Sequence, residues 1–68
     1  MSESWRSAKA DEVQVGDVVR TAGGEIVTVS RIEPAFFGRP EMLAFIEDTA
    51  QRWYKRPLPV DAPVEIAV

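Results

Sequence analysis

Apolar and polar residues alternate along several short stretches of this chain, and alternation with a period of two predicts β-strands. The pattern is clearest over residues 26–32. Residues 13–15 and 18–21 also show it, and glycines at positions 23 and 24 separate them from residues 26–32. Because glycine tolerates the positive φ that a tight turn needs, these segments predict a β-hairpin.

The second half of the chain continues with short apolar stretches. Three more strands are predicted, at residues 42–46, 52–55 and 64–68. Two prolines bracket a predicted loop over residues 33–40, and residues 47–51 and 61–63 are predicted turns. Residues 56–59 hold two more prolines and are expected to form a stiff, extended connection. The chain therefore predicts five short strands and no helix.

Residues 1–12 show no regular period, which predicts a short flexible N-terminal arm in front of a domain over residues 13–68. In that domain, five short antiparallel strands favour a meander bent into a small barrel, since closure pairs most of the exposed strand edges. Alternation predicts which side chains point inward: Val15, Val18, Val27, Val29, Leu43, Phe45, Trp53, Val64 and Ile66.

The composition agrees with one small all-β domain. Nine Val and four Ile stand against two Leu, and β-branched residues favour strands. A chain of 68 residues, 46% hydrophobic and 28% charged, can fill a thin core but cannot wall a deep ligand pocket. No small-molecule substrate is therefore expected.

The sequence contains neither Cys nor His, which removes the usual nucleophile–base pairs of catalysis and the side chains that bind zinc. We therefore expect no enzymatic activity, no metal and no cofactor. The first residues lack the basic and apolar regions of a signal peptide, and no apolar run reaches the ~20 residues of a membrane span. With no disulfide to form, these features predict a cytoplasmic protein that makes no membrane contact.

The order of motifs over residues 13–68 has a counterpart among known folds. A Gly-Asp step at Gly16 and Asp17 precedes the first strand, and a glycine turn then leads into residues 26–32. This opening hairpin resembles that of bacterial SH3-like barrels, including the KOW type, and the Arg-Trp pair at residues 52–53 before a proline-broken turn is similar too. The resemblance implies an SH3-like fold, whose members serve as adaptors, RNA or ribosome contacts and accessory domains. The turn over residues 22–25 departs from KOW elements, which have more basic and glycine-rich turns.

One candidate binding surface is the basic and aromatic run over residues 52–56, although the net charge of −3 is unusual for a nucleic-acid-binding protein. On an extended strand, Arg52, Tyr54 and Arg56 share one face, where a base can stack while the cations bind phosphate. The plainer interpretation buries Trp53 and leaves its neighbours to keep an exposed strand soluble. The residues predicted for nucleic-acid binding are Arg20, Arg31, Arg52, Tyr54, Lys55 and Arg56.

The second candidate is the pair Phe36 and Phe37, beside Gly38 and Arg39 in the predicted loop. One ring is expected to enter the core while the other faces outward, or both rings cover the open end of the barrel. Aromatic and Arg side chains contribute most to the energetics of protein interfaces. The sequence therefore predicts a non-catalytic binding module that docks a protein partner or a second copy of itself, with a nucleic-acid-binding module as the alternative. The predicted partner-binding residues are Phe36, Phe37, Arg39, Tyr54 and, as an accessory, Trp5.

Overall fold

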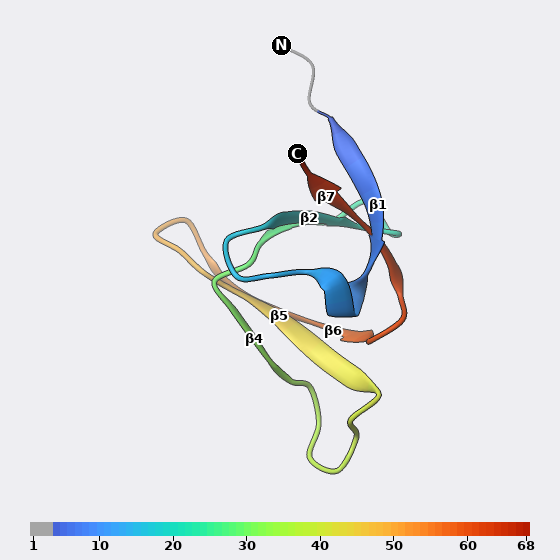
Figure 1. The fold of residues 1–68 in the computed structure, drawn as a ribbon. Coiled ribbons are helices and arrows are strands. Elements are labelled where there is room, and N and C mark those ends of the chain that lie inside the picture. The colour runs from blue at the N-terminus through green and yellow to red at the C-terminus, as the bar shows by residue number, and fades with distance from the viewer. Residues whose placement is uncertain (1–3) are drawn as a thin grey trace.

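The computed structural model describes residues 4–68, whose regular structure is seven β-strands and one turn of 3-10 helix (Figure 1). The elements are β1 (Trp5–Lys9), η1 (Ala10–Glu12), β2 (Val18–Thr21), β3 (Ile26–Thr28), β4 (Arg31–Pro34), β5 (Met42–Asp48), β6 (Trp53–Pro59) and β7 (Pro63–Ala67). The prediction of an all-β protein is confirmed. The predicted number of five strands is wrong, because one predicted strand is divided and the N-terminal segment supplies another.

The strands pair antiparallel in two sheets, one with the order β1-β7-β2-β3 and the other with the order β4-β5-β6. The second sheet is a meander, as predicted. The first is not, because β7 from the end of the chain lies between β1 and β2. Among residues 4–68 the strand pairing does not continue from one sheet into the other, so the predicted closed barrel is not found.

The predicted strand over residues 26–32 is divided where the chain passes from one sheet to the other. The Val29 amide donates to the Asp17 carbonyl at 2.9 Å, which extends the first sheet, whereas the Ser30 amide donates to the Ile46 carbonyl of β5 at 2.7 Å. Chains that connect two packed sheets bend at such corners. Val29 before this corner and Ile32 after it both face the core. Residues three positions apart on one regular strand would point to opposite faces, so the spacing of these two residues reflects the bend.

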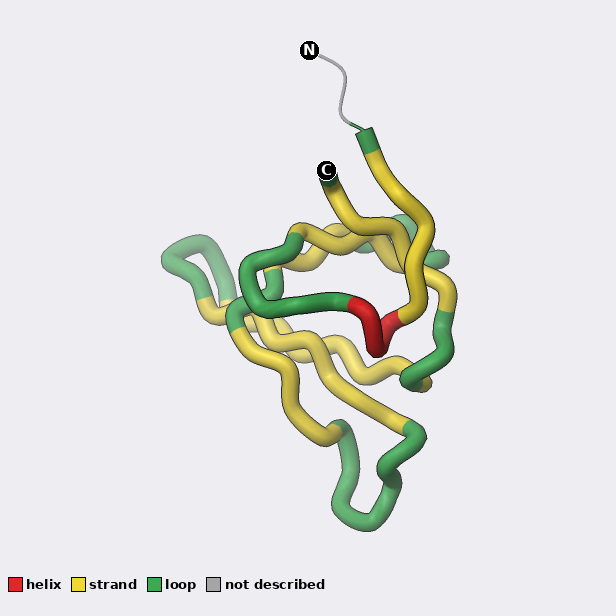
Figure 2. Tube along the Cα trace, viewed as in Figure 1, coloured by secondary structure: helices red, strands yellow, loops and turns green. Residues whose placement is uncertain are grey.

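The N-terminal segment is not the flexible arm that its sequence predicts. Strand β1 pairs with β7 along its whole length, from Trp5 opposite Ala67 to Lys9 opposite Pro63. The helical turn η1 follows directly (red in Figure 2) and buries Ala10 completely. The segment shows no clear alternation because Ala8 is small and Trp5 is only half-buried. Residues 1–3 of the predicted arm lie outside the described part of the chain.

Strand β6 continues through Pro57 and Pro59, so the predicted connection over residues 56–59 belongs to the second sheet. The Thr49 amide donates to the Arg52 carbonyl at 3.0 Å and closes the β5–β6 hairpin. Counting along the antiparallel ladder from this pair, every second residue of β6 bonds to β5, and both prolines occupy the intervening positions. A proline there removes no hydrogen bond of the ladder.

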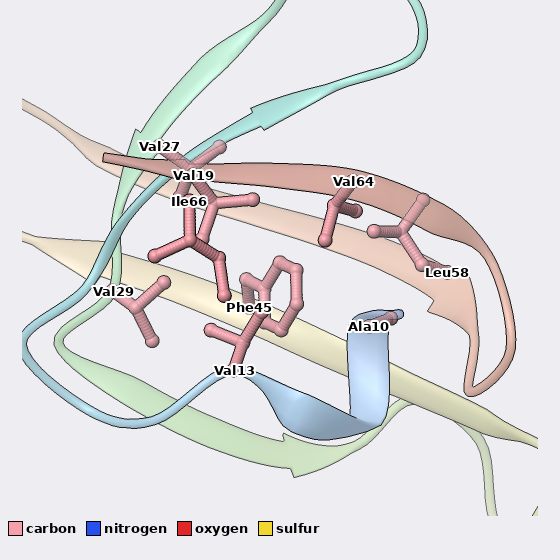
Figure 3. Close-up of a cluster of buried hydrophobic side chains, with 9 residues drawn as sticks. All are labelled: Ala10, Val13, Val19, Val27, Val29, Phe45, Leu58, Val64 and Ile66. Carbon is pink, nitrogen blue, oxygen red and sulfur yellow. The ribbon is translucent and has the colours of Figure 1, made fainter. Parts of the chain in front are cut away.

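The two sheets enclose one hydrophobic cluster, in which the Phe45 ring lies in the middle of the side chains drawn in Figure 3. Its buried members are Ala10, Val13, Val19, Val27, Val29, Phe45, Leu58, Val64 and Ile66. Five of these are predicted inward-pointing residues: Val27, Val29, Phe45, Val64 and Ile66. Val18 and Leu43 are half-buried, and Leu43 packs against the cluster.

Two predicted core residues are exposed. Val15 keeps 64% of its surface accessible, because Gly16 with a φ of 99° turns the chain directly after it. The buried positions on either side of that turn belong to Val13 and Val19. Residues 13–15 therefore do not form the predicted strand, and Val15 lies in a turn that the Asp17 amide closes by donating to the Gln14 carbonyl at 3.0 Å.

Trp53 is the other exception, with 61% of its surface exposed. Leu58 is buried at an even-numbered position of β6, and alternation along the strand then places Tyr54 on the core side and Trp53 on the outer side. The predicted strand ends at residue 55 and does not include Leu58. Its own residues therefore do not determine which face of the strand is buried.

Candidate functional site

The loop between β4 and β5 carries the most exposed large hydrophobic side chain in residues 4–68. Phe37 is fully exposed, at 106% of its reference surface, and Phe36 keeps 51%. The expectation that one ring enters the core is therefore wrong, and Ala35 is the residue that anchors the base of the loop instead. The Arg39 amide donates to the Phe36 carbonyl at 3.2 Å, and the Met42 amide donates to the Arg39 carbonyl at 3.1 Å, which shape the loop into successive turns.

An open hollow of about 340 Å³ lies within this loop. Its lining consists of Pro34, Phe36, Phe37, Gly38, Arg39 and Pro40. Gly38 has a φ of 74°, so the chain reverses at a position where a larger residue would be strained. The Arg39 guanidinium donates to the Glu41 carboxylate, and this bond lowers the pKa of Glu41. The loop therefore presents an apolar surface whose cation is already balanced.

The predicted face of Arg52, Tyr54 and Arg56 exists, but it is directed toward the first sheet. Tyr54 packs against the core cluster, and its hydroxyl donates to the Glu25 carboxylate in the β2–β3 turn. Arg56 Nε lies 3.6 Å from the same carboxylate. The guanidinium carbon of Arg52 lies 4.7 Å from the centroid of the Tyr54 ring. A base could stack on this ring only after displacing Arg52.

Glu47, at the end of β5, is buried, although its position in the sequence predicts a solvated turn. Its side chain accepts hydrogen bonds from the Thr28 amide at 3.0 Å, from Arg52 Nη2 at 3.0 Å and from the Thr49 hydroxyl at 3.2 Å. These bonds, that from Arg52 above all, lower the pKa of the Glu47 carboxyl despite its burial. The charged form of Glu47 is therefore part of the folded structure.

Within residues 4–68, β3 pairs with β2 alone, and Glu47 and Arg52 together close its free edge. The Thr28 amide donates to Glu47, and the Ile26 carbonyl accepts a hydrogen bond from Arg52 Nη2 at 2.6 Å. One acceptor and one donor thus take the place of a further strand. Arg52 consequently has a structural role in addition to the charge for which the sequence singled it out.

Because of these contacts of Glu47, the stability of the fold is expected to decrease at acid pH. Since the folded protein lowers the Glu47 pKa, the stabilisation is complete above the ordinary Glu value of 4.5 and is lost as the pH falls through the folded-state pKa. We expect the urea concentration at the unfolding midpoint to decrease as the pH is lowered below about 4.5. In a Glu47→Gln variant this decrease should be less steep. Urea titrations from pH 7 to pH 3, followed by circular dichroism, measure this difference. Equal slopes for both proteins would contradict it.

Arg20, another residue predicted for nucleic-acid binding, is held by neighbours within the first sheet. Its Nη2 atom lies 2.8 Å from the Glu65 carboxylate, and its guanidinium carbon lies 4.4 Å from the centre of a Trp5 ring. Trp5 is half-buried in this contact. Both side chains therefore pack together on the outer side of β1, β7 and β2.

Arg31 is paired as well, with Glu33 at 3.2 Å and with Asp48 at 3.1 Å. Lys55 is exposed and forms no ion pair with the residues that the structure describes. Every Arg of the predicted nucleic-acid surface is thus balanced by a carboxylate, which leaves little free positive charge on it.

The residues predicted to bind a protein partner lie in three separate places. The loop with Phe36 and Phe37 extends from one end of the second sheet, and the β5–β6 turn beside Tyr54 extends from the other end (Figure 2). The seven residues of β5 run from one end to the other, a distance of roughly 20 Å. Trp5 lies on the first sheet. Only Phe36, Phe37 and Arg39 therefore share one surface.

Sequence reasoning missed Glu25, the carboxylate that holds Tyr54 and Arg56. It identifies Glu47 as a carboxylate able to neutralise the run over residues 52–56, but not as a buried partner of Arg52. A signal exists for Glu47, since it follows directly on the apolar run at residues 42–46 and can belong to the same strand. The role of Glu25 depends on which sheet faces its turn, and local sequence does not contain that information.

Comparison with models of known protein families gives no match, and comparisons with curated proteins and with solved structures give none either. Within residues 4–68, no group of acidic side chains is arranged to hold a metal ion. None of the helical structure in the described chain is long and apolar enough to cross a membrane.

Proposed function

We propose that this chain is a small non-catalytic binding module that docks a protein partner through the loop between β4 and β5. The observation that carries this proposal is the full exposure of Phe37, beside the half-exposed Phe36 and the apolar hollow. Burying a Phe side chain stabilises a complex by about 1.5–3 kcal/mol. One or two such anchors supply much of the binding energy of an interface.

Arg39 completes the surface, because a partner carboxylate can share its guanidinium with Glu41 and so orient the complex. Tyr54 and Trp5 contribute to stability rather than to docking, since Glu25 and Arg20 already engage them. The absence of Cys and His supports a non-catalytic role.

We further propose that the two sheets form an SH3-like arrangement. Two features support it: the sheets share one core cluster, and the Thr28 amide of β3 in the first sheet donates to the Glu47 carboxylate of β5 in the second sheet at 3.0 Å. A second hydrogen bond, from the Asp11 amide to the Val60 carbonyl at 2.9 Å, ties η1 to the end of β6. Small folds of this kind place their binding residues on loops.

The alternative, nucleic-acid binding, has less support because its arginines are ion-paired and Arg52 covers Tyr54. A mixed oligonucleotide titration at about 50 and 200 mM salt, followed by NMR amide shifts, distinguishes the two functions, since phosphate contacts weaken steeply with salt. Salt-sensitive shifts at Arg31 and residues 52–56 would favour the alternative.

The docking proposal is tested with Phe37→Asp and a matched variant, Val15→Asp, which places the same charge at another exposed apolar position. Each protein is immobilised and exposed to lysate of its own organism, and the retained proteins are purified and titrated individually. We expect a binder whose affinity falls at least tenfold with Phe37→Asp, since a lost hot spot costs about 2 kcal/mol, and stays unchanged with Val15→Asp.

Two results would contradict docking of a partner through this loop. One is a binder that Phe37→Asp retains at full affinity. The other is a concentration-dependent dimer of the purified chain that Phe37→Asp dissociates, as measured by analytical ultracentrifugation, which would assign the loop to self-association.

A further inference from the structure

We propose that the free edge of β1 accepts an extended, acidic segment of a protein partner as an additional strand of the first sheet. Strand β1 is an edge strand of this sheet, on the outside of the fold (Figure 1). Its pairing with β7 fixes which backbone groups are free. The Val68 amide donates to the Ser4 carbonyl at 3.0 Å, and the Ala10 amide donates to the Ala62 carbonyl at 2.9 Å.

In an antiparallel ladder the residues between such bonded positions direct their N–H and C=O groups away from the partner strand. Ser4 and Ala10 bond toward β7, so the odd-numbered residues of β1 face the free edge. The Lys9 amide is capped by a Glu12 carboxylate oxygen at 2.7 Å. Trp5 and Ser7 remain, each with one donor and one acceptor available to an added strand.

The other sheet edges are occupied at β3 and interrupted by prolines at β4 and β6, although the Trp53 and Lys55 amides of β6 face its free edge. At β3 the side chains of Glu47 and Arg52 occupy the edge. Strand β4 ends in Pro34 and β6 contains Pro57 and Pro59, all at positions that lack the N–H an added strand would need. Strand β1 contains no proline, and no side chain from residues 4–68 caps its Trp5 or Ser7 amide.

Charge indicates what such a strand must carry. Arg6 and Lys9 are exposed and form no ion pair with residues 4–68, in contrast to the paired arginines elsewhere. They are three residues apart and lie on opposite faces of β1. An antiparallel segment with acidic residues at positions i and i+3 would meet one cation on each face. A second copy of β1 would instead bring four cations together, which disfavours self-pairing.

A shallow hollow of about 180 Å³ beside this edge adds specificity. Its lining includes Ser7, Arg20, Ala22, Pro63 and Glu65. Because the Ser7 side chain is small, the residue of the added strand that lies opposite Ser7 can place an apolar side chain over it into the hollow. The structure thus favours a segment of the form acidic-x-apolar-acidic.

The test uses the full chain labelled with ¹⁵N and a seven-residue peptide, Thr-Thr-Glu-Thr-Val-Glu-Thr, with its two Glu replaced by Lys as the control. With the Glu peptide we expect amide shifts along β1 and slower hydrogen exchange at Trp5 and Ser7. The Lys peptide is expected to bind at least tenfold more weakly. Equal binding of the two peptides, or shifts confined to other strands, would overturn the proposal.

Two variants localise the binding. Ser7→Pro removes the free-edge donor but no bond to β7, and it is expected to reduce binding at least tenfold while the amide spectrum of the other strands is retained. A joint Arg6→Gln and Lys9→Gln variant tests the charges in the same way. Undiminished binding by either variant, or dimerisation through β1 without peptide, would overturn the proposal. Phe37→Asp is expected to leave peptide binding intact, so this site and the loop are tested independently.

Discussion

Replacing Phe45 with alanine is expected to destabilise the protein by about 4 kcal/mol. The ring is fully buried and lies at the centre of the cluster that both sheets share. Total stability at this chain length is on the order of 3–10 kcal/mol, so the variant should be largely unfolded or close to it at 25 °C. Urea unfolding followed by circular dichroism, with wild-type protein in parallel, measures the loss.

Trp53→Ala is the matched control, since it removes a larger aromatic side chain from the outer face of β6. With 61% of Trp53 exposed, the expected cost is below about 1 kcal/mol. Alternation along the sequence assigns both aromatic residues to the core, whereas the structure separates them. A large loss of stability in Trp53→Ala, or a small one in Phe45→Ala, would contradict this placement.

These two residues illustrate how far local sequence predicts the fold. The β2–β3 hairpin and the apolar strand β5 follow from patterns within a few residues, and the structure confirms them. The inward direction of Phe45 also follows, because a run of apolar residues on both sides leaves it buried in either alternation. Trp53 is misplaced because the buried residue that fixes its strand, Leu58, lies beyond a proline.

Long-range pairing is what the sequence does not reveal. Strand β1 exists because β7, from the far end of the chain, lies beside it, and its own residues carry no strand pattern. The same holds for the candidate site. The exposure of Phe37 agrees with its prediction as an interface residue, but Tyr54 and Arg52 acquire partners on a turn and a strand edge that are distant in sequence. Charge counting identifies Glu47 as a possible partner of the basic run, but it does not place Glu25 or the Ile26 carbonyl beside that run.

Replacing Glu47 with alanine is expected to cost about 2–3 kcal/mol, because it leaves the Thr28 amide without its acceptor and removes the partner of Arg52 in a partly buried site. For a domain of this size that loss lowers the melting temperature by roughly 10–20 °C. Asp48→Ala is the matched control, since Asp48 is the next residue along β5 but faces outward and pairs with Arg31 at an exposed position. Thermal unfolding of both variants at pH 7 measures the difference, and a similar small shift for each would contradict the role of Glu47.

The combination of Glu47→Ala with Arg52→Ala then shows whether the two side chains act as one unit on the edge of β3. Arg52 binds both Glu47 and the Ile26 carbonyl, so removing either side chain opens part of the same edge. The losses of unfolding free energy in the two single variants should therefore add up to more than the loss in the double variant. Additive losses would mean that each side chain stabilises a different part of the fold. Non-additivity would instead assign Arg52 to the closure of the first sheet, and would explain why a buried carboxylate lies beside the basic residues at the start of β6.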